Sequence, residues 1–170
     1  MVDMTRTDDQ DPQEPRWLSD EEQQLWRRWL LAGTRIQASL ARQMQRDSGI
    51  SMADYEVLVN LSEAPGHRMR IAALADRLQW DRSRRSHQIT RMRNRELVDR
   101  EACGDDRRGA FIVLTPTGLE VIAEAAPGHV KTVRELFIDR LSPAQATELS
   151  AILGDLLTQF EIPPECLGEK

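Results

Sequence analysis

The sequence has few residues that could build covalently linked or metal-held structure. It contains two cysteines, Cys103 and Cys166, which lie far apart, outside any CxxC pair and without a histidine at metal-ligand spacing. This pattern predicts neither a disulfide framework nor a zinc site. We therefore expect two free thiols and no bound metal.

Signatures of catalysis are also missing. The sequence has no HExxH, GxSxG, GxGxxG or Walker pattern, and its histidines, His67, His87 and His129, are scattered. Ser86 stands next to His87, but adjacent side chains of a helix point about 100° apart, which is the wrong geometry for a nucleophile and its base. We expect a protein that is not an enzyme and carries no cofactor.

Long hydrophobic runs are absent as well. No apolar stretch approaches the roughly 20 residues of a membrane-spanning helix, and the N-terminus is acidic and polar, unlike a signal peptide. The chain has 170 residues, 40% hydrophobic and 30% charged, a composition typical of one globular domain. The sequence predicts a cytoplasmic protein without membrane contact.

Lysine is rare, and arginine is concentrated in one segment. Only two of the 23 basic residues are lysines, a ratio that a high-GC coding bias explains. Between Gly66 and Arg95, however, nine arginines face two acids, so this segment carries +7 and the remainder −12 in a chain of net charge −5. Such clustering predicts a surface for a polyanion, with nucleic acid as the expected partner. The alternative is a helix face that is merely solvated.

The first third of the chain predicts a polar tail and two helices. Residues 1–18 are expected to be disordered. A capping-box pattern at Ser19 begins a helix that reaches Gly49, with apolar residues at steps of three and four. A second such pattern at Ser51 begins a shorter helix, which residues 64–66 break.

The arginine-rich segment fits a winged helix-turn-helix. We expect a minimal strand at 68–70, a helix over 71–78 and, after a tight turn, a second helix over 81–95. Strands predicted over 97–103 and 110–114 flank a polar turn bounded by glycines. A hairpin that follows a helix-turn-helix forms a wing.

The C-terminal part predicts further helices and an interface. One helix begins at Thr115, and Pro127 with the following glycine should kink or interrupt it. Ser142 caps a last helix that reaches Phe160, and residues 162–170 form a tail. The first helix and the last two each carry a wide apolar stripe, so we expect a homodimer that buries these stripes. The alternative is that they close the core of a monomer.

Four stretches together carry a recognisable pattern. They are IAALADRL (71–78), WDRSRRSHQITRM (80–92), LVDRE (97–101) and DRRGAFIVLTPTG (106–118). The pattern resembles the MarR family of winged-helix transcription regulators over about residues 20–160. The resemblance implies a mainly α fold with a small β-hairpin wing. It divides a single domain, 19–161, into a winged helix-turn-helix at about 51–115 and dimerisation helices at about 19–48 and 116–161.

The resemblance also assigns roles to residues. It makes 81–95 the recognition helix, with Ile89 and Met92 on its inner face. The implied DNA contacts are Arg82, Ser83, Arg84, Ser86, His87, Thr90 and Arg91 in this helix and Arg107 and Arg108 in the wing. Arg108 matches the family position that enters the minor groove, where arginine senses groove width. Asp106 braces that arginine or the turn.

Two positions depart from the family pattern. Arg85 stands where an apolar inner-face residue is usual, and Glu96 stands where a glycine usually ends the recognition helix. Arg85 can lay its stem over the core and direct its charge outward. The role of Arg85 and the exit angle of the helix stay open.

Family members often bind a small-molecule effector between the dimer helices and the DNA-binding lobe. Trp26, Trp29 and Tyr55 are the candidate pocket residues here, with a place in the core as the alternative. Cys103 is either an oxidant sensor, as in several family members, or an inert strand cysteine. The sequence thus predicts a dimeric repressor of a pseudo-palindromic duplex operator, relieved by an effector. The alternative is a winged-helix module that binds an acidic protein.

Overall fold

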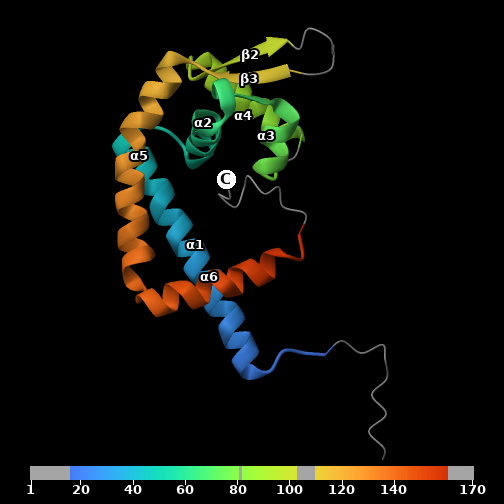
Figure 1. Cartoon of the computed structure of the whole chain (residues 1–170), viewed down its shortest axis with the longest axis vertical. Helices are drawn as coiled ribbons and strands as arrows, with labels where there is room; N and C mark the ends of the chain where they lie inside the picture. The colour runs from blue at the N-terminus through green and yellow to red at the C-terminus, as the bar shows by residue number, and fades with distance from the viewer. Residues whose placement is uncertain (1–15, 81, 103–109, 161–170) are drawn as a thin grey trace, which may run out of the picture. The chain divides into compact units, whose positions relative to one another are not determined.

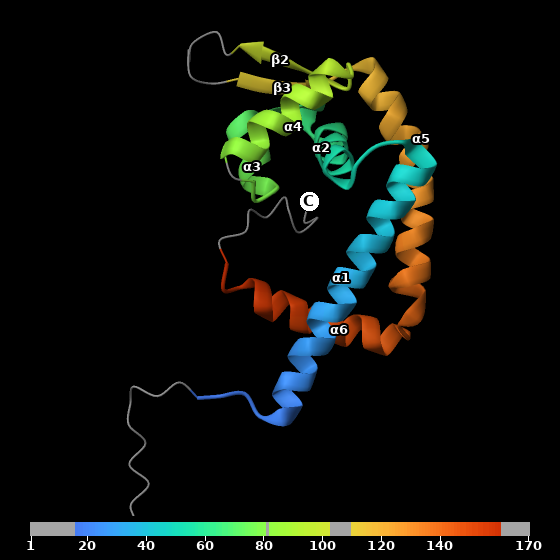
Figure 2. The same ribbon diagram turned by 180° about the vertical axis from the view of Figure 1, so that it is seen from behind.

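The computed structural model describes residues 16–80, 82–102 and 110–160, with only the backbone of 82–86. The chain divides into two compact units, one up to Arg35 and one from Ile36 onward. Figures 1 and 2 show the elements from opposite sides. They are α1 (Asp20–Ser48), α2 (Met52–Glu63), η1 (Pro65–His67), β1 (Arg68–Arg70), α3 (Ile71–Arg77), α4 (Arg82–Asn94), β2 (Val98–Ala102), β3 (Ala110–Leu114), α5 (Pro116–Leu136), η2 (Ile138–Arg140) and α6 (Pro143–Leu157).

The N-terminal unit holds the first half of α1. The predicted capping box is confirmed: Ser19 N donates to Glu22 Oε2 (2.8 Å) and Glu22 N donates to Ser19 Oγ (3.2 Å). The hydrogen bond from the Ser19 backbone lowers the pKa of Glu22. No residue from 16 to 35 is buried. The exposed large apolar side chains of this unit are Trp17, Leu18, Leu25, Trp26, Trp29, Leu30 and Leu31.

The second unit contains the hydrophobic core. The second predicted capping box is confirmed at the start of α2, between Ser51 and Asp54. Side chains of the last turns of α1, of α2 to α5 and of β2 and β3 meet in this core. Its fully or nearly fully buried members include Met44, Val57, Leu58, Leu61, Leu74, Met92, Val98, Ile112 and Ile122. The winged-helix elements gather at one end of α5, and α6 follows its other end (Figure 1).

The three predicted strands form one antiparallel sheet in the order β1-β3-β2. Val98 pairs with Leu114 and Ala102 with Ala110. Along β3, buried residues alternate with part-buried ones because successive side chains of a strand point to opposite faces. Ala110, Ile112 and Leu114 face the core and are buried. The sheet therefore closes one side of the core and carries an exposed outer face.

The C-terminal helices follow the prediction except at Pro127. The sequence predicts a kink or an interruption there; the helix is not interrupted, and α5 passes through Pro127 as one element. Proline removes one backbone donor, and Ile122 and Ala125, which precede it in the helix, pack into the core. The predicted cap of α6 at Ser142 is confirmed, and no residue of α6 is buried. Among the described helices, none has the length and hydrophobicity that crossing a membrane requires.

Candidate nucleic-acid interface

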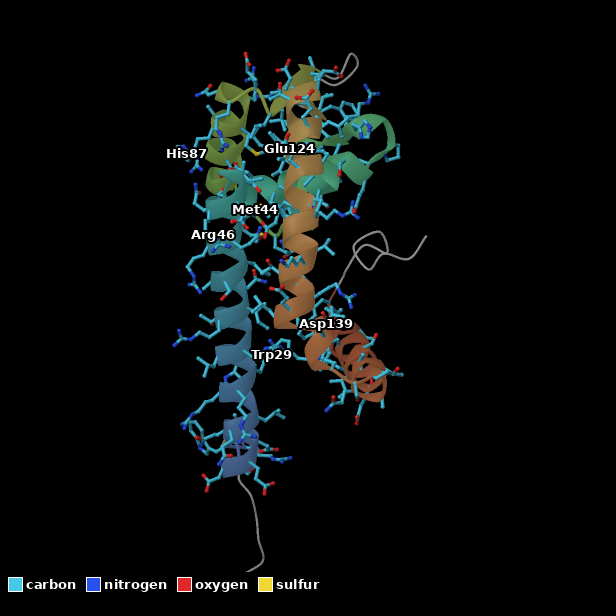
Figure 3. All side chains as sticks on the ribbon, turned by 90° about the vertical axis from the view of Figure 1, so that its left-hand side faces the viewer. Trp29, Met44, Arg46, His87, Glu124 and Asp139 are labelled. Atoms are coloured by element: carbon cyan, nitrogen blue, oxygen red, sulfur yellow. The ribbon has the colours of Figure 1, made fainter. Side chains whose placement is uncertain are left out.

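Helix α4 presents one polar face to solvent and one face to the core. Ile89 and Met92 are buried as predicted, whereas Thr90 and Arg91 are exposed. His87 is exposed as well (Figure 3). The division of faces expected for a recognition helix is thus confirmed for the residues from 87 onward. The other expected contacts lie outside the described side chains: Arg82, Ser83, Arg84 and Ser86 in α4 and Arg107 and Arg108 in the wing. Arg85, Cys103, Asp106 and Cys166 lie outside them too.

A buried carboxylate fixes α4 to the start of α2. Asp54 is 1% exposed, and its Oδ1 accepts a hydrogen bond from Gln88 Nε2 at 2.5 Å. Its Oδ2 accepts from Ser51 N and from Arg95 Nη1, both at 2.9 Å. Arg95 Nη2 also donates to Gly49 O at 3.4 Å. One side chain therefore ties the middle and the end of α4 to the α1–α2 junction.

Sequence reasoning found only part of this arrangement. The capping pattern predicted the contact between Ser51 and Asp54, but Arg95 was counted only as part of the arginine cluster. Gln88 carried no signal, although it is a polar residue directly before the inner-face Ile89. Because a buried polar group is normally hydrogen-bonded, a glutamine at that edge of the core required a partner that the sequence does not identify.

Both helices of the helix-turn-helix end in the same backbone motif. Gln79 after α3 and Glu96 after α4 have φ values of +50° and +58°. The N–H of Trp80 and of Leu97 then reaches back five residues to a carbonyl, at 2.9 Å and 3.0 Å. These are the bonds of a Schellman ending. Glu96 adopts the left-handed conformation that glycine provides without strain, so α4 ends in this motif although the glycine of the family pattern is absent.

A close backbone contact fixes the wing to α5. A Cβ on Gly118 would lie 2.1 Å from the carbonyl oxygen of Leu97, so no larger residue fits without a shift of the backbone. Thr115 Oγ1 accepts from Gly118 N (2.9 Å), and its one hydroxyl proton is shared between Glu96 O (2.6 Å) and the same carbonyl oxygen of Leu97 (3.0 Å). Thr115 and Gly118, which both belong to the family pattern, thus connect the strands of the wing to α5 through one set of backbone contacts.

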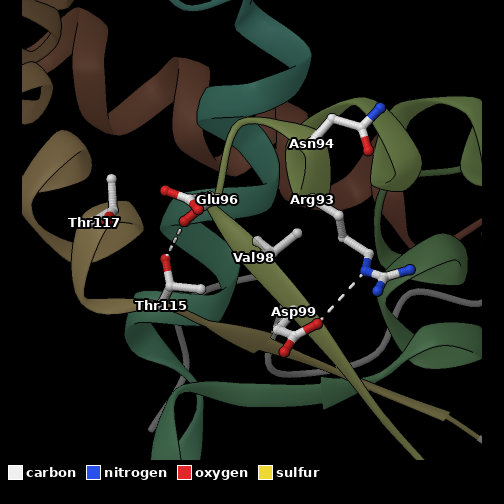
Figure 4. Close-up of a pocket in the computed structure, with 7 residues that line it drawn as sticks. All are labelled: Arg93, Asn94, Glu96, Val98, Asp99, Thr115 and Thr117. Atoms are coloured by element: carbon white, nitrogen blue, oxygen red, sulfur yellow. Dashed lines mark hydrogen bonds and ion pairs between the residues drawn. The ribbon is translucent and has the colours of Figure 1, made fainter.

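A polar pocket of about 460 Å³ lies beside the end of α4. Arg93 Nε and Asp99 Oδ1 form an ion pair across it at 3.5 Å, and Thr115 Oγ1 donates to Glu96 O at 2.6 Å (Figure 4). Its lining is Arg93, Asn94, Glu96, Val98, Asp99, Thr115 and Thr117. None of the three predicted effector residues is among them.

The effector candidates belong to different units. Trp26 and Trp29 are 53% and 54% exposed in the N-terminal unit, so neither is a core residue there. Tyr55 is buried in the second unit, where its ring centroid lies 4.4 Å from that of His129. Burial, with a smaller effect of the nearby Glu63, raises the pKa of Tyr55, and burial lowers that of His129. Among the described residues, no group of three or more His, Cys, Asp or Glu could hold a metal.

Comparisons with known proteins agree on one family. A sequence model of the MarR family matches residues 48–109. The transcriptional regulator HosA of Escherichia coli is 32% identical over 114 residues, which are 67% of this chain and 82% of HosA.

Two solved structures from Streptomyces coelicolor are similar over most of the chain. AbsC, a MarR family transcriptional regulator, is 48% identical with a TM-score of 0.81, and the match covers 85% of this chain and 97% of AbsC. Sco3205, a MarR family transcriptional regulator crystallised in complex with DNA, is 41% identical with a TM-score of 0.83 over 87% and 93% of the two chains.

Proposed function

The chain belongs to the MarR family of transcriptional regulators, and from that premise we propose that it is a homodimeric, non-enzymatic DNA-binding repressor. The observation that carries the proposal is the exposed face of α4. It projects His87, Thr90 and Arg91 from the arginine-rich segment of an otherwise acidic chain, while Asp54 ties the helix to the fold. The DNA complex of Sco3205 supports this role for the same fold.

Sequence would be recognised from the outer face of α4. Arginine pairs with the O6 and N7 of guanine through two hydrogen bonds, and serine, threonine and histidine donate to base edges or phosphates. Arg82, Ser83, Arg84, Ser86, His87, Thr90 and Arg91 are the proposed contacts of this helix, and Arg107 and Arg108 those of the wing. The inner-face anchors Ile89 and Met92 fix which side of the helix is offered to the groove.

The exposed apolar surface supports a homodimer. Leu25 is 70% exposed in α1, and Ile152 and Leu156 are each 49% exposed in α6. Covering such side chains with a second copy is worth roughly 25 cal/mol per Å² of apolar surface. A two-fold dimer would read half-sites about one helical turn, or roughly 10–11 bp, apart. DNA binding would place the protein in the cytoplasm.

Relief of repression by a small molecule completes the proposal. Trp26, Trp29 and Tyr55 stay the candidate pocket residues. The two tryptophans offer exposed aromatic faces, and Tyr55 offers a hydroxyl beside the ring of His129. Effector binding would lower the affinity for the operator by favouring a dimer in which the two recognition helices no longer match the half-sites.

Footprinting and salt-dependent titration test the proposal. The full chain should protect a pseudo-palindromic site, with affinity that falls steeply as salt rises. Arg84→Ala should cost about 1–3 kcal/mol and relax discrimination at one base position, whereas Arg108→Ala should reduce the salt slope by about one and act most on narrow A·T-rich flanks. Binding to an acidic protein with no footprint on genomic DNA would instead support the protein-interaction module.

Truncation tests the dimer separately. Removal of residues 142–170 deletes α6 and its exposed apolar side chains, so the remaining chain should sediment as a monomer or aggregate. A well-folded dimer of the truncated chain would contradict the proposed interface.

A further inference from the structure

The outer face of the sheet holds two arginines against one aromatic ring. Arg70 pairs with Phe111 and Arg68 with Val113 across β1 and β3. Paired residues, and residues two apart on one strand, share a face of the sheet, so both arginines flank the phenyl ring. The Cζ atom of Arg68 lies 4.7 Å from the ring centroid and that of Arg70 lies 5.5 Å from it. Both distances are within the range of a cation–π interaction.

This arrangement limits the freedom of two exposed cations. A long arginine side chain loses rotamer entropy when a partner immobilises it. Contact with Phe111 removes part of that freedom in advance, and the planar guanidinium can still present N–H donors to an anion. A pair of oriented arginines on one surface suits the oxygens of phosphate groups.

The acids on this face are already engaged. Glu101 Oε2 lies 3.4 Å from Arg68 Nη1, and the two side chains are 53% and 51% exposed. Asp99 pairs with Arg93 of α4. Exposed ion pairs contribute little to stability, so a phosphate can replace Glu101 as the partner of Arg68 at small cost.

The position of Arg70 relates this face to DNA. Arg70 directly precedes α3, the first helix of the helix-turn-helix. In such motifs the first helix crosses the DNA backbone while the second enters the major groove. The side chain at the start of α3 therefore lies where a phosphate strand is expected to pass.

We propose that Arg68 and Arg70, oriented by Phe111, form a phosphate-binding surface that extends the DNA contact beyond α4 and the wing. The inference rests on the proposed function and deepens it. Neither arginine is among the DNA contacts that the family pattern implies. The partner is the backbone of duplex DNA, so this surface adds affinity without adding sequence discrimination.

Charge removal is the first test. Full-length wild type and Arg68→Gln/Arg70→Gln are titrated with the operator duplex and with a random duplex of equal length at several salt concentrations. The double variant should lose about one unit of salt slope per arginine, with the same fold-loss of affinity on both duplexes and an unchanged melting temperature.

Arg134→Gln is the matched control, since it removes one arginine from an exposed pair with Asp139 (2.6 Å) near the far end of α5. Its salt slope should equal that of the wild type. An unchanged slope in the double variant, or an equal change per arginine in the control, overturns the proposal. Wild-type protein without salt-dependent DNA binding contradicts the proposed function itself.

Two variants separate orientation from charge. Phe111→Leu keeps every charge, so it should weaken binding to both duplexes without changing the salt slope. Glu101→Gln removes the carboxylate that competes with phosphate for Arg68 and should tighten binding. Wild-type affinity in Phe111→Leu would show that the ring does not orient the arginines, and unchanged affinity in Glu101→Gln would count against Arg68 as a contact.

Discussion

Removal of the Asp54 carboxylate should loosen α4 and destabilise the fold. In Asp54→Ala, the buried Gln88 amide and the backbone N–H of Ser51 both lose their acceptor. A buried donor without a partner costs about 1–3 kcal/mol. The side chain of Arg95 is 42% exposed and can form hydrogen bonds with water instead, so its lost contact adds little to the loss of stability. We expect a loss of about 3 kcal/mol in the free energy of unfolding, mainly from the buried Gln88 amide and the part-buried N–H of Ser51.

The amide variant has a smaller expected effect. In Asp54→Asn, the remaining oxygen can still accept from Ser51 and Arg95, and the Gln88 amide can turn over so that its own oxygen accepts from the new NH₂ group. The loss should then be about 1 kcal/mol, the typical net value of one hydrogen bond. Stability should therefore increase from Asp54→Ala to Asp54→Asn to wild type. This order tests the assigned hydrogen bonds independently of the size of each loss.

Urea denaturation at a fixed protein concentration measures these losses, because dimerisation contributes to the apparent stability. Glu135→Ala is the control: the Glu135 side chain is 57% exposed and its ion pair with Lys131 is long, at 3.9 Å, so the change should stay within about 0.5 kcal/mol. Operator affinity should fall in Asp54→Ala even where the chain is fully folded. An unfolding free energy within 1 kcal/mol of wild type would refute the argument.

Three further predictions concern the backbone and one histidine. Gly118→Ala should lower the free energy of unfolding by about 2 kcal/mol or more, because the new Cβ would lie 2.1 Å from Leu97 O. Gly154→Ala has no atom within 4 Å of the new Cβ and should stabilise α6 by up to about 1 kcal/mol. Similar melting temperatures for the two variants would contradict this prediction. Glu96→Gly should raise the unfolding free energy by up to about 1 kcal/mol by relieving a φ of +58°, and a lower melting temperature would count against it. Burial lowers the pKa of His129 from its ordinary 6.5, so the unfolded chain binds the proton more tightly and stability should fall as the pH drops through 6.5. That fall should shrink in His129→Phe, and an equal fall in both proteins would exclude His129 as its source.

Most of the helices and strands, and their order, can be predicted from local features of the sequence. Apolar residues at steps of three or four, capping boxes at Ser19, Ser51 and Ser142, and the glycine-bounded turn are local signals. They act between neighbours in the chain, so they can be read without knowing the fold. The division of α4 into inner and outer faces follows from the same periodicity, which is why the exposure of His87 and the burial of Met92 were predictable.

Tertiary structure alone decided how those elements are held together. Asp54 meets Gln88 and Arg95 across 34 and 41 positions of the chain, and the same carboxylate can cap its own helix without them. Arg68 and Arg70 contact the ring of Phe111 only because β1 pairs with β3, the central strand of the sheet. The continuity of α5 through Pro127 belongs here too, because the local sequence favours a break at that position. Such contacts depend on which residues meet in space, and a local pattern carries no information about that.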